Sequence, residues 1–130
     1  MNRVLLDTHA VLWWLSAPER LPPRALAAMR SPNTEVLFSS VSTAELAVKL
    51  GIGRLTLPVP LDRLVSDLFL RDGFTGLPFT HDHALALARL PLHHRDPFDR
   101  MLVAQASAEA VPIVTADAAL QQYAVTILWA

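Results

Sequence analysis

Short runs of apolar residues alternate with segments of helical spacing along the whole chain. Five apolar runs favour buried strands, at residues 3–6, 35–38, 77–79, 111–115 and 125–129. Between them, apolar residues recur every three or four positions, which predicts helices at residues 10–15, 24–30, 42–50, 61–71, 83–90, 97–110 and 118–123. Glycine or proline follows most of these helices, as at Gly51, Gly73 and Pro91. The pattern therefore predicts strands and helices in alternation.

The predicted strands are mostly apolar without interruption rather than alternately apolar and polar. Such strands have both faces covered, because an exposed face would carry a polar residue at every second position. We therefore expect one domain of the α/β class over residues 1–130, a three-layer α/β/α fold with a mostly parallel central sheet. In such sheets, ligands bind outside the carboxyl ends of the strands, so functional residues are expected there.

The composition excludes several classes of protein. Hydrophobic residues make up 52% and charged residues 18%, which excludes a disordered chain. Cysteine is absent, so a disulfide framework or a thiolate zinc site is excluded, and a cytoplasmic setting is expected. A net charge of −1 argues against holding nucleic acid by bulk charge. We expect no membrane span, because no apolar run approaches the ~20 residues that a bilayer requires. We expect no signal peptide, because Met1-Asn2-Arg3 leads into a short apolar run with no cleavage pattern.

Four acidic residues fall where a predicted strand ends or a predicted helix begins. Asp7 and Asp117 follow strands, whereas Glu45 and Asp99 lie in the first turns of helices. Most of these points share one edge of a parallel sheet, so several carboxylates are expected to converge there. Grouped carboxylates raise one another's pKa or bind a cation, and their hard oxygens suit Mg²⁺ or Mn²⁺. This pattern indicates metal-dependent hydrolysis of a phosphodiester.

Each of these acids, taken alone, also fits a structural role. Asp7 and Asp117 could cap the helices that follow them, and a capping box would let Glu45 reach back to Ser42. Asp96 reads either as the cap of the helix that begins at residue 97 or as a further site acid. The joint pattern is harder to explain by capping alone, because Ser, Thr or Asn would serve equally well. Capping and metal binding do not exclude each other.

Several motifs resemble those of a known family. The sequence HHRDPFDRMLVAQA at residues 93–106 resembles the H-x-D-P-F-D-R signature of PIN-domain proteins, and more narrowly of VapC-like toxins of type II toxin–antitoxin pairs. LLDTH at 5–9 is similar to the opening strand and first acid of the family, and VTAD at 114–117 to the end of its fourth strand. STAELAVK at 42–49 resembles the helix of the second acid, although Ala44 replaces the aromatic residue that often precedes it.

The resemblance implies an Mg²⁺-dependent endoribonuclease, in which Mn²⁺ can substitute, acting as the toxin of such a pair. Asp7 and Asp99 would then be the main metal ligands, and Glu45 and Asp117 would complete the catalytic pocket. Thr115 would be a hydrogen-bond partner of this site. The implied partners are an RNA substrate, a cognate antitoxin that blocks the site and a second copy of the chain in a homodimer.

Three basic residues are candidates to hold the RNA backbone. Arg95 and Arg100 flank the acidic motif, and Lys49 lies one helical turn after the acid of the second helix. Guanidinium groups suit bidentate contacts with phosphate. A solvated position at the surface would explain each of the three equally well.

The histidines and tryptophans raise further alternatives. His81 and His83 are two positions apart and do not share a helix face, and no HExxH motif occurs, so a zinc site is disfavoured. His94 is expected to contact substrate or to cap the chain locally. Trp13 and Trp14 lie in a predicted helix that is apolar nearly all round, which places them in the core or at a dimer interface.

Three other functions compete with the nuclease. A receiver-like signalling domain needs a lysine at the end of a late strand, but the one lysine, Lys49, lies in a predicted helix. A phosphatase of the D-x-D type needs an acid where His9 stands. A catalytically silent PIN fold that only binds RNA or a partner is left open by the sequence, although the intact acids argue against it.

Overall fold

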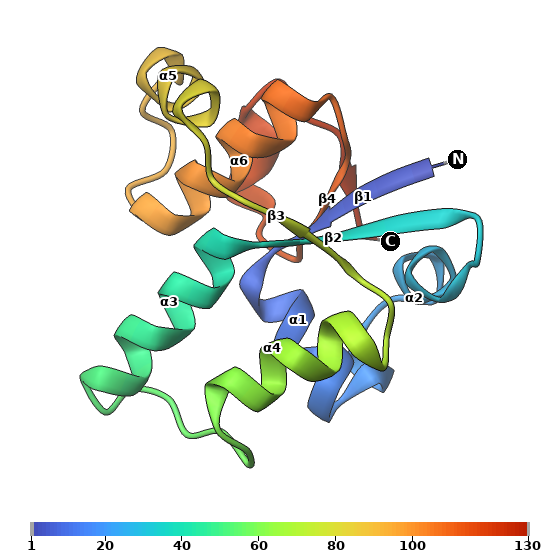
Figure 1. Cartoon of the computed structure of the whole chain (residues 1–130). Coiled ribbons are helices and arrows are strands. Elements are labelled where there is room, and N and C mark those ends of the chain that lie inside the picture. Colours follow the sequence, from blue (N-terminus) through green and yellow to red (C-terminus); the bar gives the residue numbers. More distant parts are fainter. Residues whose placement is uncertain (1, 130) are drawn as a thin grey trace.

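The computed structural model describes residues 2–129, which contain a five-stranded sheet. Its strands are β1 (Asn2–Leu6), β2 (Thr34–Ser39), β3 (Thr75–Leu77), β4 (Ile113–Val114) and β5 (Ile127–Leu128). Their order across the sheet is β3-β2-β1-β4-β5, and every recorded pair is parallel (Figure 1). The predicted α/β class with a parallel central sheet is confirmed.

Helices cover both faces of this sheet. They are α1 (Thr8–Ser16), α2 (Pro23–Arg30), α3 (Ser40–Gly51), α4 (Leu61–Leu70), α5 (His81–Arg89) and α6 (Pro97–Glu109), with short 3₁₀ helices η1 (Pro18–Arg20) and η2 (Ala118–Gln122). In Figure 1, α5 and α6 lie on one side of the sheet and α1, α2 and α4 on the other, while α3 leaves the end of β2. Between residues 2 and 129, no helix combines the length and apolar character that a membrane crossing requires.

Successive residues of the central strands feed two separate cores. Leu6 and Phe38 pack with α1, α2 and α4. Leu5 and Leu37 face the other way and pack with residues of α6 that include Leu102. Each of these five side chains is at most 1% exposed, and burying one contributes about 1.5–3 kcal/mol. Uninterrupted apolar strands are therefore required, because both faces of the sheet are covered.

The start of α3 differs from the prediction. Strand β2 continues to Ser39, and the helix begins at the next residue. The Ser39 hydroxyl accepts the Val41 N–H at 3.0 Å and is the N-cap. Ser42 therefore lies inside the helix, and the predicted capping box between Ser42 and Glu45 is wrong. The Glu45 carboxylate is left available for other partners.

Other boundaries also shift. Strand β3 ends at Leu77 rather than beginning there, because Pro78 lacks the N–H that a ladder requires. Helix α5 begins two residues before the predicted start, since Thr80 and His83 form a capping box that the sequence analysis did not recognise. The segment predicted as a helix at 118–123 is the 3₁₀ helix η2.

All five strands run in one direction, so their carboxyl ends share one edge of the sheet. Strand β1 ends next to Asp7, β2 leads into α3, and β4 leads through Thr115 to Asp117. The backbone ties two of these ends together, because the Asp7 N–H donates to the Val114 carbonyl at 3.0 Å. This edge is where the predicted acids meet.

Candidate functional site

Asp7 lies directly after β1 and is 5% exposed. One of its oxygens accepts the Ala10 N–H at 2.8 Å, so Asp7 is the N-cap of α1. Burial raises the pKa of the Asp7 carboxyl above its ordinary value, and the hydrogen bonds from Thr115 and Ala10 offset only part of this rise. A buried carboxyl of this kind favours either a proton or a nearby cation.

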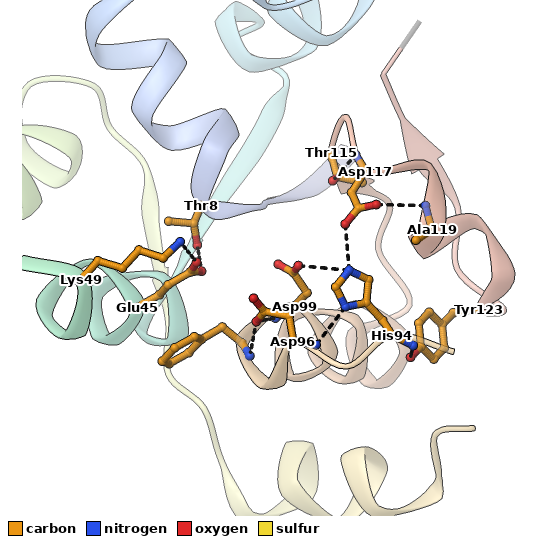
Figure 2. Close-up of polar contacts among 11 residues, drawn as sticks. Thr8, Glu45, Lys49, His94, Asp96, Asp99, Thr115, Asp117, Ala119 and Tyr123 are labelled. Atoms are coloured by element: carbon orange, nitrogen blue, oxygen red, sulfur yellow. Dashed lines mark hydrogen bonds and ion pairs between the residues drawn. The ribbon is translucent and has the colours of Figure 1, made fainter. Parts of the chain in front are cut away.

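Glu45 is 2% exposed, and both of its carboxylate oxygens have partners. The Thr8 hydroxyl donates to Oε1 at 2.6 Å, and the Lys49 ammonium donates to Oε2 at 2.6 Å (Figure 2). Lys49 lies one helical turn further along α3, so the ion pair joins adjacent turns of one helix. The Thr8 hydroxyl also lies 3.0 Å from the Ser42 hydroxyl. Glu45 is thus a charged but fully partnered group.

Asp99 lies in the first turn of α6, between Glu45 and His94 in Figure 2. Burial raises the pKa of its carboxyl to about 7, and the negative charges of Asp96 and Glu45 add to the rise. Asp96 itself caps α6, accepting the N–H groups of Phe98 and Asp99 at 2.8 and 3.2 Å. Asp96 is therefore the predicted helix cap, whereas Asp99 has a charge that the protein balances poorly.

Asp117 divides its two oxygens between a helix and a histidine. One oxygen accepts the Ala119 N–H at 3.0 Å and caps η2. The other lies 2.9 Å from Nε2 of His94, which is also 3.5 Å from an oxygen of Asp99 (Figure 2). Because Nδ1 of His94 accepts the Asp96 N–H at 3.0 Å, the neutral ring carries its proton on Nε2 and donates it toward the carboxylates.

A cavity of about 320 Å³ opens over these acids. It is lined by Asp7, His9, Trp13, Asp99, Ala116 and Asp117. Ligand atoms of His94, Asp99 and Asp117 lie within 4.8 Å of one another, close enough to surround one metal ion. Three larger cavities, two of about 510 Å³ and one of about 420 Å³, lie elsewhere and include none of these carboxylates. The small acidic cavity is the candidate site because two carboxyl groups with raised pKa values, those of Asp7 and Asp99, line it together.

The donor set fits a hard divalent cation. Carboxylates from the ends of β1 and β4 and from the first turn of α6 border one cavity. The raised pKa values of Asp7 and Asp99 follow from burial and like charge, which a bound cation would relieve. Such oxygens suit Mg²⁺ or Mn²⁺. Asp7, Asp99 and Asp117 line the cavity, and Asp99 and Asp117 belong with His94 to the group of atoms close enough to surround one ion.

The predicted basic residues lie in three different settings. Arg95 is exposed beside the acidic motif, and no ion pair is recorded for it among residues 2–129. A guanidinium nitrogen of Arg100 donates to the Leu90 carbonyl at 3.3 Å, which directs it to the connection between α5 and α6. The Lys49 ammonium pairs with Glu45. Arg95 is thus the basic residue of the three with the greatest freedom to meet a ligand.

The histidines do not gather at one point. His83 is buried and its Nε2 lies 3.0 Å from a Glu109 oxygen, while the His93 ring packs against Tyr123. Of these three histidines, His94 is the one whose ring reaches Asp99 and Asp117. Its backbone N–H donates to the Tyr123 hydroxyl at 2.9 Å. The sequence analysis anticipated a local contact of His94 but not its position between two carboxylates. No sequence spacing signals that contact, because the partner Asp117 lies 23 positions away, at the residue before η2.

Thr8 and His9 were also missed as members of the site. Both follow Asp7 directly, so their adjacency to the first acid was the available signal. The Thr8 hydroxyl orients Glu45, and His9 lines the cavity. Trp13 lines the cavity as well and stacks against Trp129 at 5.4 Å between ring centroids.

Sequence comparison gives two related matches. The PIN domain family matches residues 4–125 of the chain. The chain is also 30% identical over 124 residues to ribonuclease VapC22 of Mycobacterium tuberculosis, a match that covers 95% of this chain and 93% of that protein.

Two solved structures illustrate the similarity of fold. VapBC2 from Rickettsia felis, solved bound to a DNA fragment from their promoter, gives a TM-score of 0.71 at 17% identity and covers 98% of this chain and 99% of that one. FitAcB from Neisseria gonorrhoeae gives a TM-score of 0.61 at 22% identity, with 96% of each chain covered. At these identities the likeness shows a shared fold. The family match over residues 4–125 and the 30% identity to ribonuclease VapC22 show that the chain belongs to the PIN-domain family.

Proposed function

We propose that the protein is an Mg²⁺-dependent endoribonuclease and the toxin of a type II toxin–antitoxin pair. The observation that carries this proposal is the meeting of Asp7, Asp99 and Asp117 at one cavity, with the pKa of Asp99 raised to about 7. The 30% identity of the chain to ribonuclease VapC22 supports the same activity. The resemblance of the DPFDR segment to the signature of VapC-like toxins is consistent with it.

A bound Mg²⁺ would neutralise phosphate oxygens and lower the pKa of a water molecule that attacks the phosphodiester. Asp7 and Asp99 are proposed as its main ligands, with Asp117 beside them. His94 holds Asp117 by donating from Nε2, which fixes the direction of the carboxylate. Glu45, held by Thr8 and Lys49 at the inner side of the site, is proposed to act on the ion and its water through its negative charge. The metal-binding and positioning tasks are thus divided among separate elements.

The proposed RNA contacts are Arg95, Arg100 and Lys49. Arg95 is exposed, whereas the other two hold partners within the protein. With so few contacts and a net charge of −1, RNA shape and unpaired bases would contribute more to selectivity than bulk attraction. The other proposed partners are a cognate antitoxin, whose basic side chain would pair with the carboxylates, and a second copy of the chain.

Cleavage of a short single-stranded RNA tests the proposal. Wild type is compared with Asp99→Asn in excess Mg²⁺, and Asp82→Asn, an exposed position on α5, is the matched control. We expect Asp99→Asn to lose about 100-fold or more of the cleavage rate, since removing one charged group from such a site has effects of that size. Asp82→Asn keeps the wild-type rate. Equal cleavage by Asp99→Asn and wild type would instead favour a PIN fold that only binds.

A further inference from the structure

We infer that Lys49 is a built-in counter-ion of Glu45 that limits the acidic site to one divalent cation. The inference rests on the proposed metal site and adds the number of ions and the residue that sets it. It departs from the expectation that Lys49 serves chiefly to hold the RNA backbone.

Both carboxylate oxygens of Glu45 already accept hydrogen bonds within the protein. Its carboxylate is 2% exposed, and its two oxygens are taken by the Thr8 hydroxyl and the Lys49 ammonium, each at 2.6 Å. Breaking this pair is costly on the Glu45 side, because the buried carboxylate would lose its compensating charge, whereas the Lys49 side chain is 35% exposed. In Figure 2, the Lys49 ammonium and Asp99 lie on opposite sides of Glu45. Glu45 therefore already has a cationic partner before any metal ion arrives.

The cavity that an ion can enter does not include Glu45. The cavity is lined by Asp7, Asp99 and Asp117 but not by Glu45 or Lys49. The close group of potential metal-binding atoms likewise draws on Asp99 and Asp117 but not on Glu45. An ion that enters the cavity meets three carboxylates there. Glu45 lies behind them, where it affects the ion through its field rather than through a direct bond.

The positive charge of Lys49 would repel a second cation bound at Glu45. Glu45 is a further buried carboxylate behind the cavity, so a second ion held on that side would use it as a ligand. At that position, the second ion would lie beside the Lys49 ammonium, and two positive charges at such a distance repel each other. Removing the Lys49 charge should therefore raise the affinity for divalent cations and open a second position at Glu45.

Titration with Mn²⁺, with the free ion counted by electron paramagnetic resonance, tests this inference. Wild type should bind one Mn²⁺ per chain. Lys49→Met should bind a second ion or bind Mn²⁺ about tenfold more tightly or better, as loss of a neighbouring unit charge predicts. Lys49→Arg retains the charge and should behave as wild type. Arg54→Met, which removes an exposed positive charge after α3, controls for net charge and should also behave as wild type.

Thermal melting provides a second readout. Without metal, Lys49→Met should melt below wild type, because buried Glu45 loses its counter-ion, and Mn²⁺ should restore more stability to the variant than to wild type. Should Lys49→Met fail to fold, Lys49→Gln keeps a hydrogen-bond donor without the charge and carries the same expectation.

The outcomes separate this inference from the proposed function. Two Mn²⁺ ions on wild type, or unchanged Mn²⁺ binding in the uncharged Lys49 variants while Asp99→Asn loses it, would overturn the role of Lys49 and leave the metal site standing. Unchanged binding in Asp99→Asn would overturn the proposed site itself, and the inference with it.

Discussion

An aspartate at the start of a helix can cap it and still present an oxygen to a ligand. Asp117 uses one oxygen for the Ala119 N–H and turns the other toward His94. Asp7 similarly caps α1 while lining the acidic cavity. The sequence could place both acids at helix starts but could not separate the two roles, because both require the same position. Asp96 has the capping role alone: it accepts the N–H groups of Phe98 and Asp99 but does not line the acidic cavity.

Asp99 makes the stability of the metal-free protein depend on pH. Its pKa rises from 3.8 in the unfolded chain to about 7 in the fold, so the folded state favours the protonated form. The corresponding stability is fully present below pH 3.8 and is lost as the pH rises through about 7. At 1.36 kcal/mol per pKa unit, the loss is at most roughly 4 kcal/mol.

The Asp99→Asn substitution keeps the shape of the side chain but removes its titratable carboxyl group. In EDTA at pH 8, this variant should therefore be more stable than wild type by about 1–4 kcal/mol, and the difference should vanish below about pH 4. Urea unfolding at the two pH values measures it, with exposed Asp82→Asn as the control. A variant less stable than wild type at pH 8 would show that Asp99 serves the fold rather than a ligand.

At the scale of single elements, the sequence was most informative where side-chain chemistry is local. Asp96 followed by Pro97 correctly predicted the start of α6, because both the cap and the fixed proline angle act within one turn. The start of α3 was wrong because Ser39 and Ser42 are equally good caps, and the length of β2 decides between them. That length depends on pairing with β1 and β3, which the sequence alone does not contain.

The end of α6 carries a strained residue. Ala110 is its C-cap and has φ 54°, in the left-handed region that disfavours residues with a Cβ atom. Ala110 is also exposed, so a glycine there loses no packing. We expect Ala110→Gly to stabilise the protein by about 1 kcal/mol, whereas Ala108→Gly, inside the same helix, should destabilise it by about 1 kcal/mol. Urea unfolding of the two variants checks the pair, and equal losses in both would contradict it.

At the scale of the whole molecule, the class of fold followed from the apolar strands but the order of strands did not. Leu5 and Leu37 would be buried whichever strands lay beside theirs, so their hydrophobicity does not indicate the order of strands in the sheet. The convergence of the acids was predicted only in outline. It depends on β1 lying between β2 and β4, which brings Asp7 near residues more than ninety positions away.

Self-association is the second expectation at this scale. The sequence analysis placed a dimer contact near Trp13 and Trp14, and both tryptophans have partners within the chain. Trp13 packs against Trp129, while the Trp14 indole donates to Asp72 at 3.1 Å. We keep the prediction of a symmetric dimer, because apolar Ile52 and Leu70 also lie exposed, at 60% and 85%. Sedimentation at micromolar concentration should show a dimer, and a monomer alone would refute it.

The central claim is that the carboxylates at this sheet edge act by holding a divalent cation. The most direct test is the rate of single-stranded RNA cleavage by one sample as free Mg²⁺ is first removed with EDTA and then restored. The account predicts that cleavage stops in excess EDTA and returns when Mg²⁺ exceeds the chelator, because the bound ion would lower the pKa of the attacking water and neutralise the phosphate oxygens. Cleavage that continues at full rate in excess EDTA would contradict it.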